Sequence, residues 1–180
     1  MKLLNKTITG ILASSWTDLV LFKVSWILLV VYQSAAIMPA LLIIFVKLFS
    51  WQNLSHYLAL VLTTVLAGVA MDLMLAGAGV FVFSEPFFPP WLIILWMSFA
   101  LTLPRGFGFI LKLHVSLQAL TGFIAGGVGY FAGYMLGAVE LGIAPIPALL
   151  LIAVLWALFV PTLIWLDTNF YNPLKAGADA

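Results

Sequence analysis

Long, unbroken runs of apolar residues are the feature that most limits what this chain can fold into. Three runs, near 57–82, 115–138 and 147–166, each have the roughly 20 residues that a helix needs to cross a bilayer. They are continuous rather than alternating, which favours helices over the strands of a membrane barrel. With 65% hydrophobic and 7% charged residues, a soluble fold of this size could not bury its apolar surface. The sequence therefore predicts an all-α polytopic membrane bundle, in one domain over residues 1–180.

The first apolar stretch, residues 19–51, is too long for one span and is expected to form a helical hairpin. Its turn falls in "QSAAIMP" (33–39), where Pro39 suits the first turn of the second helix. The two spans are then 18–33 and 35–50. The alternative is a cleaved signal peptide that ends near "SAA", although a lysine interrupts its apolar part.

The number of spans and their orientation follow from a shorter run and from the basic residues. The run at 90–104 ends at a proline and brings the number of expected helices to six. A cytoplasmic N-terminus then gives both termini and nearly all basic residues to the cytoplasmic side, as the positive-inside rule requires. These basic residues are Lys2, Lys6, Lys47, Arg105, Lys112 and Lys175.

One carboxylate, Asp72, stands inside an apolar run, "LAGVAMDLMLAGAGVF". Gly68, Asp72, Ala76 and Gly79 have helical spacing and so share one face. Small residues mark the face that packs on other helices, so Asp72 is expected to point into the bundle. A charge at mid-membrane costs about 2.5–3.5 kcal/mol even on the lenient insertion scale. Asp72 is therefore either a hydrogen-bonded structural carboxyl or a proton or substrate site.

Other polar residues could join Asp72 in an intramembrane site. Gln33 and Ser34 are expected near its depth, Tyr130 and Tyr134 could line a cavity, and Glu85 stands in the outer loop "FSEPFFPPW". Alternatively, Glu85 is a solvated residue at the membrane interface, and the two tyrosines are packed against other side chains.

Glycines in "TGFIAGGVGYFAGYMLGA" recur at helical spacing on one face, which predicts close helix packing. We expect packing positions at Gly122, Gly126, Gly129, Gly133 and Gly137, and at Gly68 in the earlier run.

The cytoplasmic segment "TLPRGFGFILKLH" (102–114) offers two basic residues to lipid headgroups. Arg105 and Lys112 are candidates for binding an anionic headgroup, or they anchor the chain as the positive-inside rule describes. His56 and His114 have no ligand-spaced companion and the chain has no cysteine, so neither a metal site nor a cofactor is expected. A net charge of +1 does not suggest nucleic-acid binding.

Several ordered motifs carry a resemblance to a known family. "LFKVSW", "GVAMDLML", "PWLIILWMSFALTL" and "LTGFIAGGVGYFAGYMLGAV" are similar to the bacterial inner-membrane proteins of domain-of-unknown-function family 2878, over most of residues 17–166. The resemblance implies an inner (plasma) membrane location and a link to fatty-acyl or membrane-lipid modification. Where the family often has an Asn-His pair, this chain has Pro104 and Arg105, so only Asp72 is carried over as a candidate, with no assigned role.

Three functions remain open from the sequence. The first is a lipid-associated accessory protein whose partners are membrane lipid and a lipid-modifying enzyme or a second copy of the chain. The second is a small proton-coupled transporter that uses Asp72, although the sequence has no repeat symmetry. The third is a membrane-embedded enzyme, for which no second catalytic group is evident.

Overall fold

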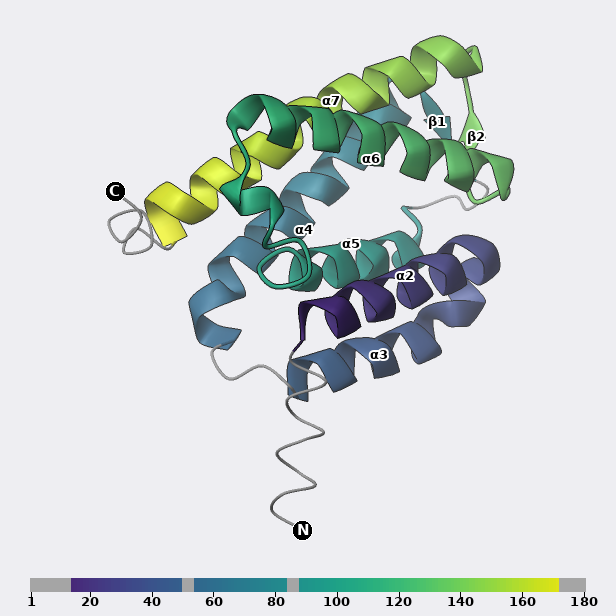
Figure 1. Ribbon diagram of the computed structural model, residues 1–180. Coiled ribbons are helices and arrows are strands. Elements are labelled where there is room, and N and C mark those ends of the chain that lie inside the picture. Colours follow the sequence, from purple (N-terminus) through teal and green to yellow (C-terminus); the bar gives the residue numbers. More distant parts are fainter. Residues whose placement is uncertain (1–13, 50–53, 84–87, 172–180) are drawn as a thin grey trace. The chain divides into compact units, whose positions relative to one another are not determined.

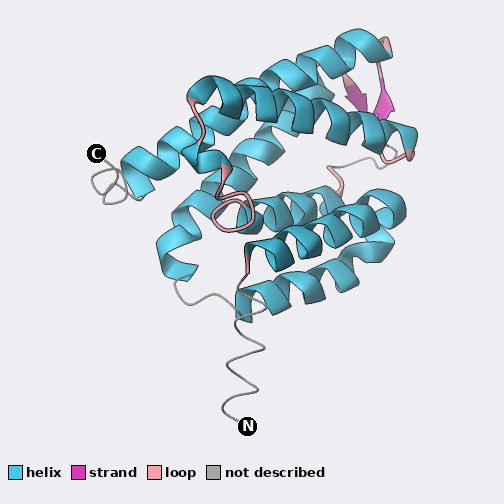
Figure 2. Cartoon of the chain, in the orientation of Figure 1, coloured by secondary structure: helices cyan, strands magenta, loops and turns pink. Residues whose placement is uncertain are grey.

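The computed structural model describes residues 14–49, 54–83 and 88–171, which form helices joined by short turns (Figure 1). Short strands lie among these helices (Figure 2), where Phe81–Val82 pairs with Glu140–Leu141, and the predicted all-α class is confirmed. The elements are, in chain order, α2 (Ser15–Tyr32), the 3-10 helix η1 (Gln33–Ala36), α3 (Ile37–Phe49), α4 (Leu54–Gly77), β1 (Phe81–Val82), α5 (Pro90–Thr102), the 3-10 helix η2 (Ile110–Lys112), α6 (Val115–Met135), β2 (Glu140–Leu141), α7 (Pro145–Leu166) and the π-helix η3 (Asp167–Tyr171).

The chain divides into two compact units. The first unit comprises Met1–Val65 and Pro89–Phe109, and the second comprises Leu66–Phe88 and Ile110–Ala180. The helix α4 contributes its first part to one unit and its last part to the other, because the division falls after Val65.

The first unit is built on the predicted hairpin. The helix α2 ends at Tyr32, and Gln33 takes a φ of 49°, a left-handed conformation that cannot continue a helix. One 3-10 turn later α3 begins, with Pro39 in its first turn as expected. The chain reverses here, so that α2 and α3 lie antiparallel (Figure 1) and α5 packs on both.

An apolar cluster holds these helices together. Ile44 of α3, Val61 of α4, and Ala100 and Leu101 of α5 are buried against one another. Partly buried side chains pack around them, namely Leu41, Leu48, Val65, Ile94 and Met97. Because four buried residues from three helices meet here, the cluster fixes which face of α3 and α5 points inward.

Among the described residues, four segments are long and apolar enough to cross a membrane, which identifies a membrane protein. They are Ser15–Phe49, Tyr57–Gly77, Val115–Met135 and Pro145–Asn169. The first of these contains the whole α2–α3 hairpin. The helices α3 and α5 have 13 residues each and rise only about 20 Å, less than the roughly 30 Å of the hydrocarbon core. Six crossings, and the side on which the termini lie, therefore stay predictions.

Two predicted spans are shorter than expected because glycines end them. The helix α4 stops at Gly77 instead of reaching 82, and α6 stops at Met135 instead of 138. A glycine with positive φ follows each helix, Gly79 at 71° and Gly137 at 72°. Its amide donates to the carbonyl three residues earlier, and the amide of the next residue donates to the carbonyl five residues before itself. This is the Schellman arrangement, which only glycine adopts without strain. The strands β1 and β2 follow these two ends and pair antiparallel.

The second unit is centred on the contact between α6 and α7. A Cβ on Gly122 would collide with the Trp156 carbonyl, and one on Gly126 with the Trp156 side chain. The two helices therefore approach closely at these glycines, where bulkier residues would separate them.

The other glycines of the expected packing face differ from these two. At Gly129 and Gly133 a Cβ would meet no described atom within 4 Å. Gly137 lies beyond the end of α6, in the turn, so it is not on the helix face and the spacing argument was wrong for it.

Candidate functional site

Three charged side chains meet where helices of the first unit begin and end. Asp18 is in the first turn of α2, Lys47 is in the last turn of α3, and Arg105 is in the turn that follows α5. An acidic residue suits a helix N-terminus and a basic residue suits a C-terminus, because of the helix dipole. In an antiparallel hairpin these two ends are adjacent, which brings Asp18 and Lys47 together.

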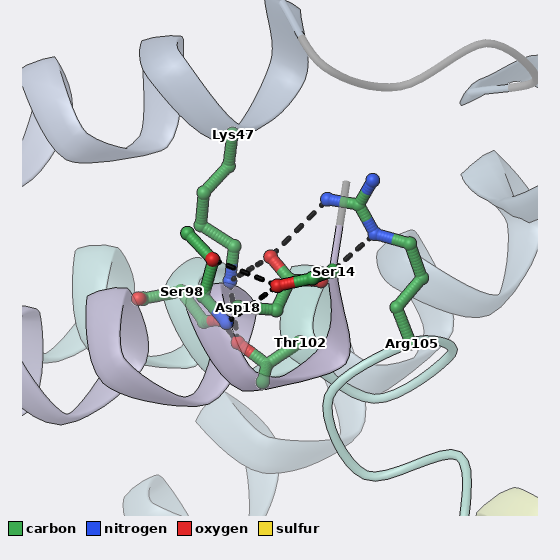
Figure 3. Close-up of polar contacts among 7 residues, drawn as sticks. Ser14, Asp18, Lys47, Ser98, Thr102 and Arg105 are labelled. Atoms are coloured by element: carbon green, nitrogen blue, oxygen red, sulfur yellow. Dashed lines mark hydrogen bonds and ion pairs between the residues drawn. The ribbon is translucent and has the colours of Figure 1, made fainter. Parts of the chain in front are cut away.

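Asp18 is the centre of this ion cluster, which we define as Asp18, Lys47, Thr102 and Arg105 (Figure 3). Arg105 donates from Nε to Asp18 Oδ2 at 2.8 Å and from a terminal nitrogen to Oδ1 at 3.2 Å. The Lys47 ammonium lies 3.5 Å from Oδ1 and donates to Thr102 Oγ1 at 2.5 Å. Thr102 in turn donates to the Ser98 carbonyl at 2.7 Å. The forked arginine contact fixes the carboxylate in one orientation.

The ion cluster is buried except for part of one side chain. The side chains of Asp18 and Lys47 have no exposed area, whereas that of Arg105 is 21% exposed. Buried ions need partners, because desolvation costs several kcal/mol for each ion. Arg105 is thus the member of the cluster that a ligand from outside can reach.

The sequence of the first unit is basic. Asp18 is its sole acidic residue, and its basic residues are Lys2, Lys6, Lys23, Lys47 and Arg105. Such an excess of basic residues favours an anionic ligand.

The turn after α5 is held in place by aromatic rings and by a glycine. Phe22 of α2 packs against Phe99 of α5 at 6.0 Å and against Phe107 of the turn at 5.5 Å, between ring centroids. At Gly106 a Cβ would lie 2.5 Å from the Thr102 side chain. The backbone beside Arg105 is therefore packed closely onto Thr102, which positions the guanidinium over Asp18.

A second polar contact lies in the second unit. Tyr130 of α6 donates a hydrogen bond of 2.6 Å to Asp72 of α4, and Asp72 has no exposed area. The tyrosine ring stacks on Phe81 at 5.3 Å and lies edge-on to Trp156 at 6.2 Å. Asp72 is thus directed inward, and Gly68 of the predicted small-residue face is buried as well. Gly79 was wrongly placed on that face, because it lies in the turn beyond the end of α4.

The remaining predicted residues of the intramembrane site are placed differently. Gln33 and Ser34 are in η1 of the first unit, and Tyr134 is partly buried on α6, one turn beyond Tyr130. Glu85 lies outside the described residues. Of the expected set, the structure therefore joins Asp72 to Tyr130.

The two residues predicted to bind a lipid headgroup belong to different units. Arg105 belongs to the ion cluster, whereas Lys112 is exposed in η2 of the second unit. His114 is exposed and caps α6 by accepting from the Ser116 amide. Across the described part of the chain, no group of three His, Cys, Asp or Glu residues could hold a metal ion.

Asp18 and Lys47 were not singled out from the sequence as site residues. The signal was present, because Asp18 opens the first span, Lys47 closes the second, and Arg105 follows the short helix. Charges of opposite sign at one end of a predicted hairpin indicate an ion pair. In the sequence analysis Lys47 and Arg105 were assigned to the positive-inside pattern, which considers each charge alone, and Asp18 was not considered.

Comparison with known proteins gives a family without an assigned activity. No curated protein and no solved structure matches the chain. The family described as protein of unknown function (DUF2878) matches residues 15–162, a range that contains Asp18, Lys47, Asp72, Arg105 and Tyr130. Because the match covers most of the sequence, the chain belongs to this family of proteins of unknown function.

Proposed function

We propose that this membrane protein binds an anionic lipid, with the lipid phosphate at the ion cluster. The observation that carries the proposal is the gathering of two cations on one carboxylate, with Arg105 21% exposed. A phosphate would approach the exposed part of Arg105, in a unit whose sequence has five basic residues and one acidic residue. Arginine is suited to this role, since its planar fork matches phosphate oxygens and its charge is permanent.

The depth of the cluster fits a headgroup. The three charged residues belong to the first turn of α2, the last turn of α3 and the turn after α5. Ends of apolar helices coincide with the boundary between hydrocarbon and headgroups. Trp16 stands two residues before Asp18 and is 79% exposed, and tryptophan is enriched at that boundary.

The wider role proposed is that of a lipid-associated accessory protein in a bacterial inner membrane, with six spans and both termini in the cytoplasm. It would present an acyl lipid to a lipid-modifying enzyme. The cluster would then be on the cytoplasmic face, where anionic lipids attract basic residues.

Lipid binding to the purified protein tests this proposal. Native mass spectrometry would compare phosphatidylglycerol with phosphatidylcholine on the unaltered chain, on Arg105→Gln and on Lys112→Gln. Lys112 is the matched control because it is basic and exposed but lies outside the cluster. Hydrogen bonds to charged groups contribute about 1.5–3 kcal/mol, so Arg105→Gln should weaken phosphatidylglycerol binding about tenfold or more.

The outcomes separate a site from general attraction. A preference for phosphatidylglycerol that Arg105→Gln abolishes and Lys112→Gln leaves intact supports the proposal. Equal weakening by both substitutions would indicate unspecific attraction of an anionic lipid and would overturn it, as would equal binding of both lipids to the unaltered chain.

A second candidate function, proton-coupled transport, is favoured by the contact between Tyr130 and Asp72. A buried carboxyl that accepts from a phenol at 2.6 Å can hold a proton and pass it on. Because the chain has no cysteine, Asp72→Cys can be labelled with a membrane-impermeant thiol reagent. Labelling would show that water reaches the site and would favour transport, and its absence in folded protein would count against it.

A further inference from the structure

Three hydroxyl groups in the first unit are buried in an unusual way. Ser25 of α2, Thr64 of α4 and Ser98 of α5 have no exposed area. Their hydroxyl oxygens have no hydrogen-bond partner within the described part of the chain. An unsatisfied buried polar group costs about 1–3 kcal/mol, and such groups in proteins are usually satisfied by ordered water.

Other hydroxyls in the same helices and in the second unit behave differently. Thr102, Thr121, Thr162 and Thr168 each donate to the carbonyl four residues earlier, at 2.7–2.9 Å. This contact with its own helix is the ordinary solution for a hydroxyl in an apolar helix. Ser25 and Ser98 do not use it, so their oxygens are directed at something other than their own helices.

Helical spacing places Ser25 and Ser98 on the faces that carry the ion cluster. Ser25 is seven residues after Asp18, two turns along α2 and about 10 Å deeper. Ser98 is four residues before Thr102, one turn along α5 and about 6 Å deeper. In Figure 3 the Ser98 hydroxyl points away from the Lys47 ammonium, further along α5. The helices α2 and α5 pack on each other, so both serines continue the polar face of the cluster into the unit.

Thr64 has a different setting. It is three residues after Val61 and directly before Val65, and both of these valines pack in the apolar cluster with Ala100 and Leu101. Ser98 also has a residue of this apolar cluster, Leu101, one turn away. The difference is that Thr102 of the ion cluster lies one turn from Ser98 and Asp18 lies two turns from Ser25, whereas α4, the helix of Thr64, carries no residue of the ion cluster. Thr64 is the natural comparison for a buried hydroxyl in dry surroundings.

We infer that the first unit contains an internal water site at Ser25 and Ser98, one to two helical turns further into the unit than the Asp18–Lys47 pair. A buried water needs two to four polar partners, and the two serine hydroxyls supply two of them. The site goes beyond lipid binding at Arg105, because it lies deeper in the unit than the ion cluster. Water there would satisfy the two buried hydroxyls.

Thiol exchange tests the site directly, since a single cysteine in this chain has no background. Ser25→Cys, Ser98→Cys and the control Thr64→Cys each replace a hydroxyl by a thiol of similar size. The purified full-length variants would be transferred from H₂O to D₂O, and the loss of the S–H infrared band followed with time. Exchange at positions 25 and 98 should be at least tenfold faster than at 64. Exchange at 25 and 98 as slow as at 64 would overturn the inference, and so would exchange that is equally fast at all three positions.

The sign of a stability change gives a second test if a thiol variant does not fold. Ser98→Ala should lower the midpoint of thermal unfolding, because the water loses a partner. Thr64→Val should leave it unchanged or raise it, because it removes an unsatisfied group at nearly constant volume. A midpoint that Ser98→Ala leaves unchanged or raises would show a dry site and would overturn the inference. A midpoint that Thr64→Val lowers as much as Ser98→Ala does would overturn it too, because water would not be confined to Ser25 and Ser98.

Discussion

The Asp18 carboxylate is shared by Lys47 and Arg105, which predicts that its removal destabilises the fold more than the removal of either cation. Asp18→Asn removes the carboxylate that Lys47 and Arg105 both contact, and the Lys47 side chain has no exposed area. Removing one partner of a buried ion pair costs about 3–5 kcal/mol. For a chain of this length that corresponds to a fall of about 6–20 °C in the unfolding midpoint.

The single substitutions of the cations should be much milder. Arg105→Gln leaves Asp18 with Lys47, and Lys47→Met leaves Asp18 with the forked Arg105 contact. In each case Asp18 keeps one cation, and the loss should be about 1.5–3 kcal/mol, the size of a hydrogen bond to a charged group. The double variant leaves a lone buried carboxylate and should lose far more than the sum of the two single changes.

Unfolding of the purified variants in detergent micelles, by heat or by a denaturing detergent, measures these differences. Anionic lipid should restore part of the stability of Asp18→Asn, because a phosphate can replace the lost charge, whereas phosphatidylcholine should not. The reasoning is refuted if Asp18→Asn is no less stable than Arg105→Gln, or if the two cation substitutions are additive.

Two further predictions concern the second unit. Gly126→Ala should destabilise the protein by about 1–3 kcal/mol, because the added methyl group collides with Trp156. The control Gly129→Ala meets no described atom and should gain up to about 1 kcal/mol from helix propensity. Equal unfolding midpoints of the two variants would contradict the observed α6–α7 contact. Tyr130→Phe should destabilise by about 1–3 kcal/mol because it removes the donor to a buried carboxyl, and the control Tyr134→Phe, on the same helix, should be near neutral, which the same unfolding assay would measure.

The sequence by itself determined that the chain lies in a membrane, that it is helical, and where several helices turn. Continuous apolar runs are a local property, and lipid leaves the backbone few other ways to satisfy its hydrogen bonds. The reversal near Gln33 and the end of α5 before Pro104 are local too, because proline and short polar segments act on the adjacent backbone. The inward direction of Asp72 followed from the spacing of its small neighbours.

Only the tertiary structure decided which polar groups meet. Asp18 and Arg105 are 87 residues apart in the chain, and Asp72 and Tyr130 are 58 apart. Their contacts depend on which helices pack side by side and at what depth, which hydropathy does not encode, since any apolar face can pack on any other. For the same reason the contact of Arg105 with Asp18 could not be predicted from the sequence, which indicated Arg105 only as a candidate for binding a lipid headgroup.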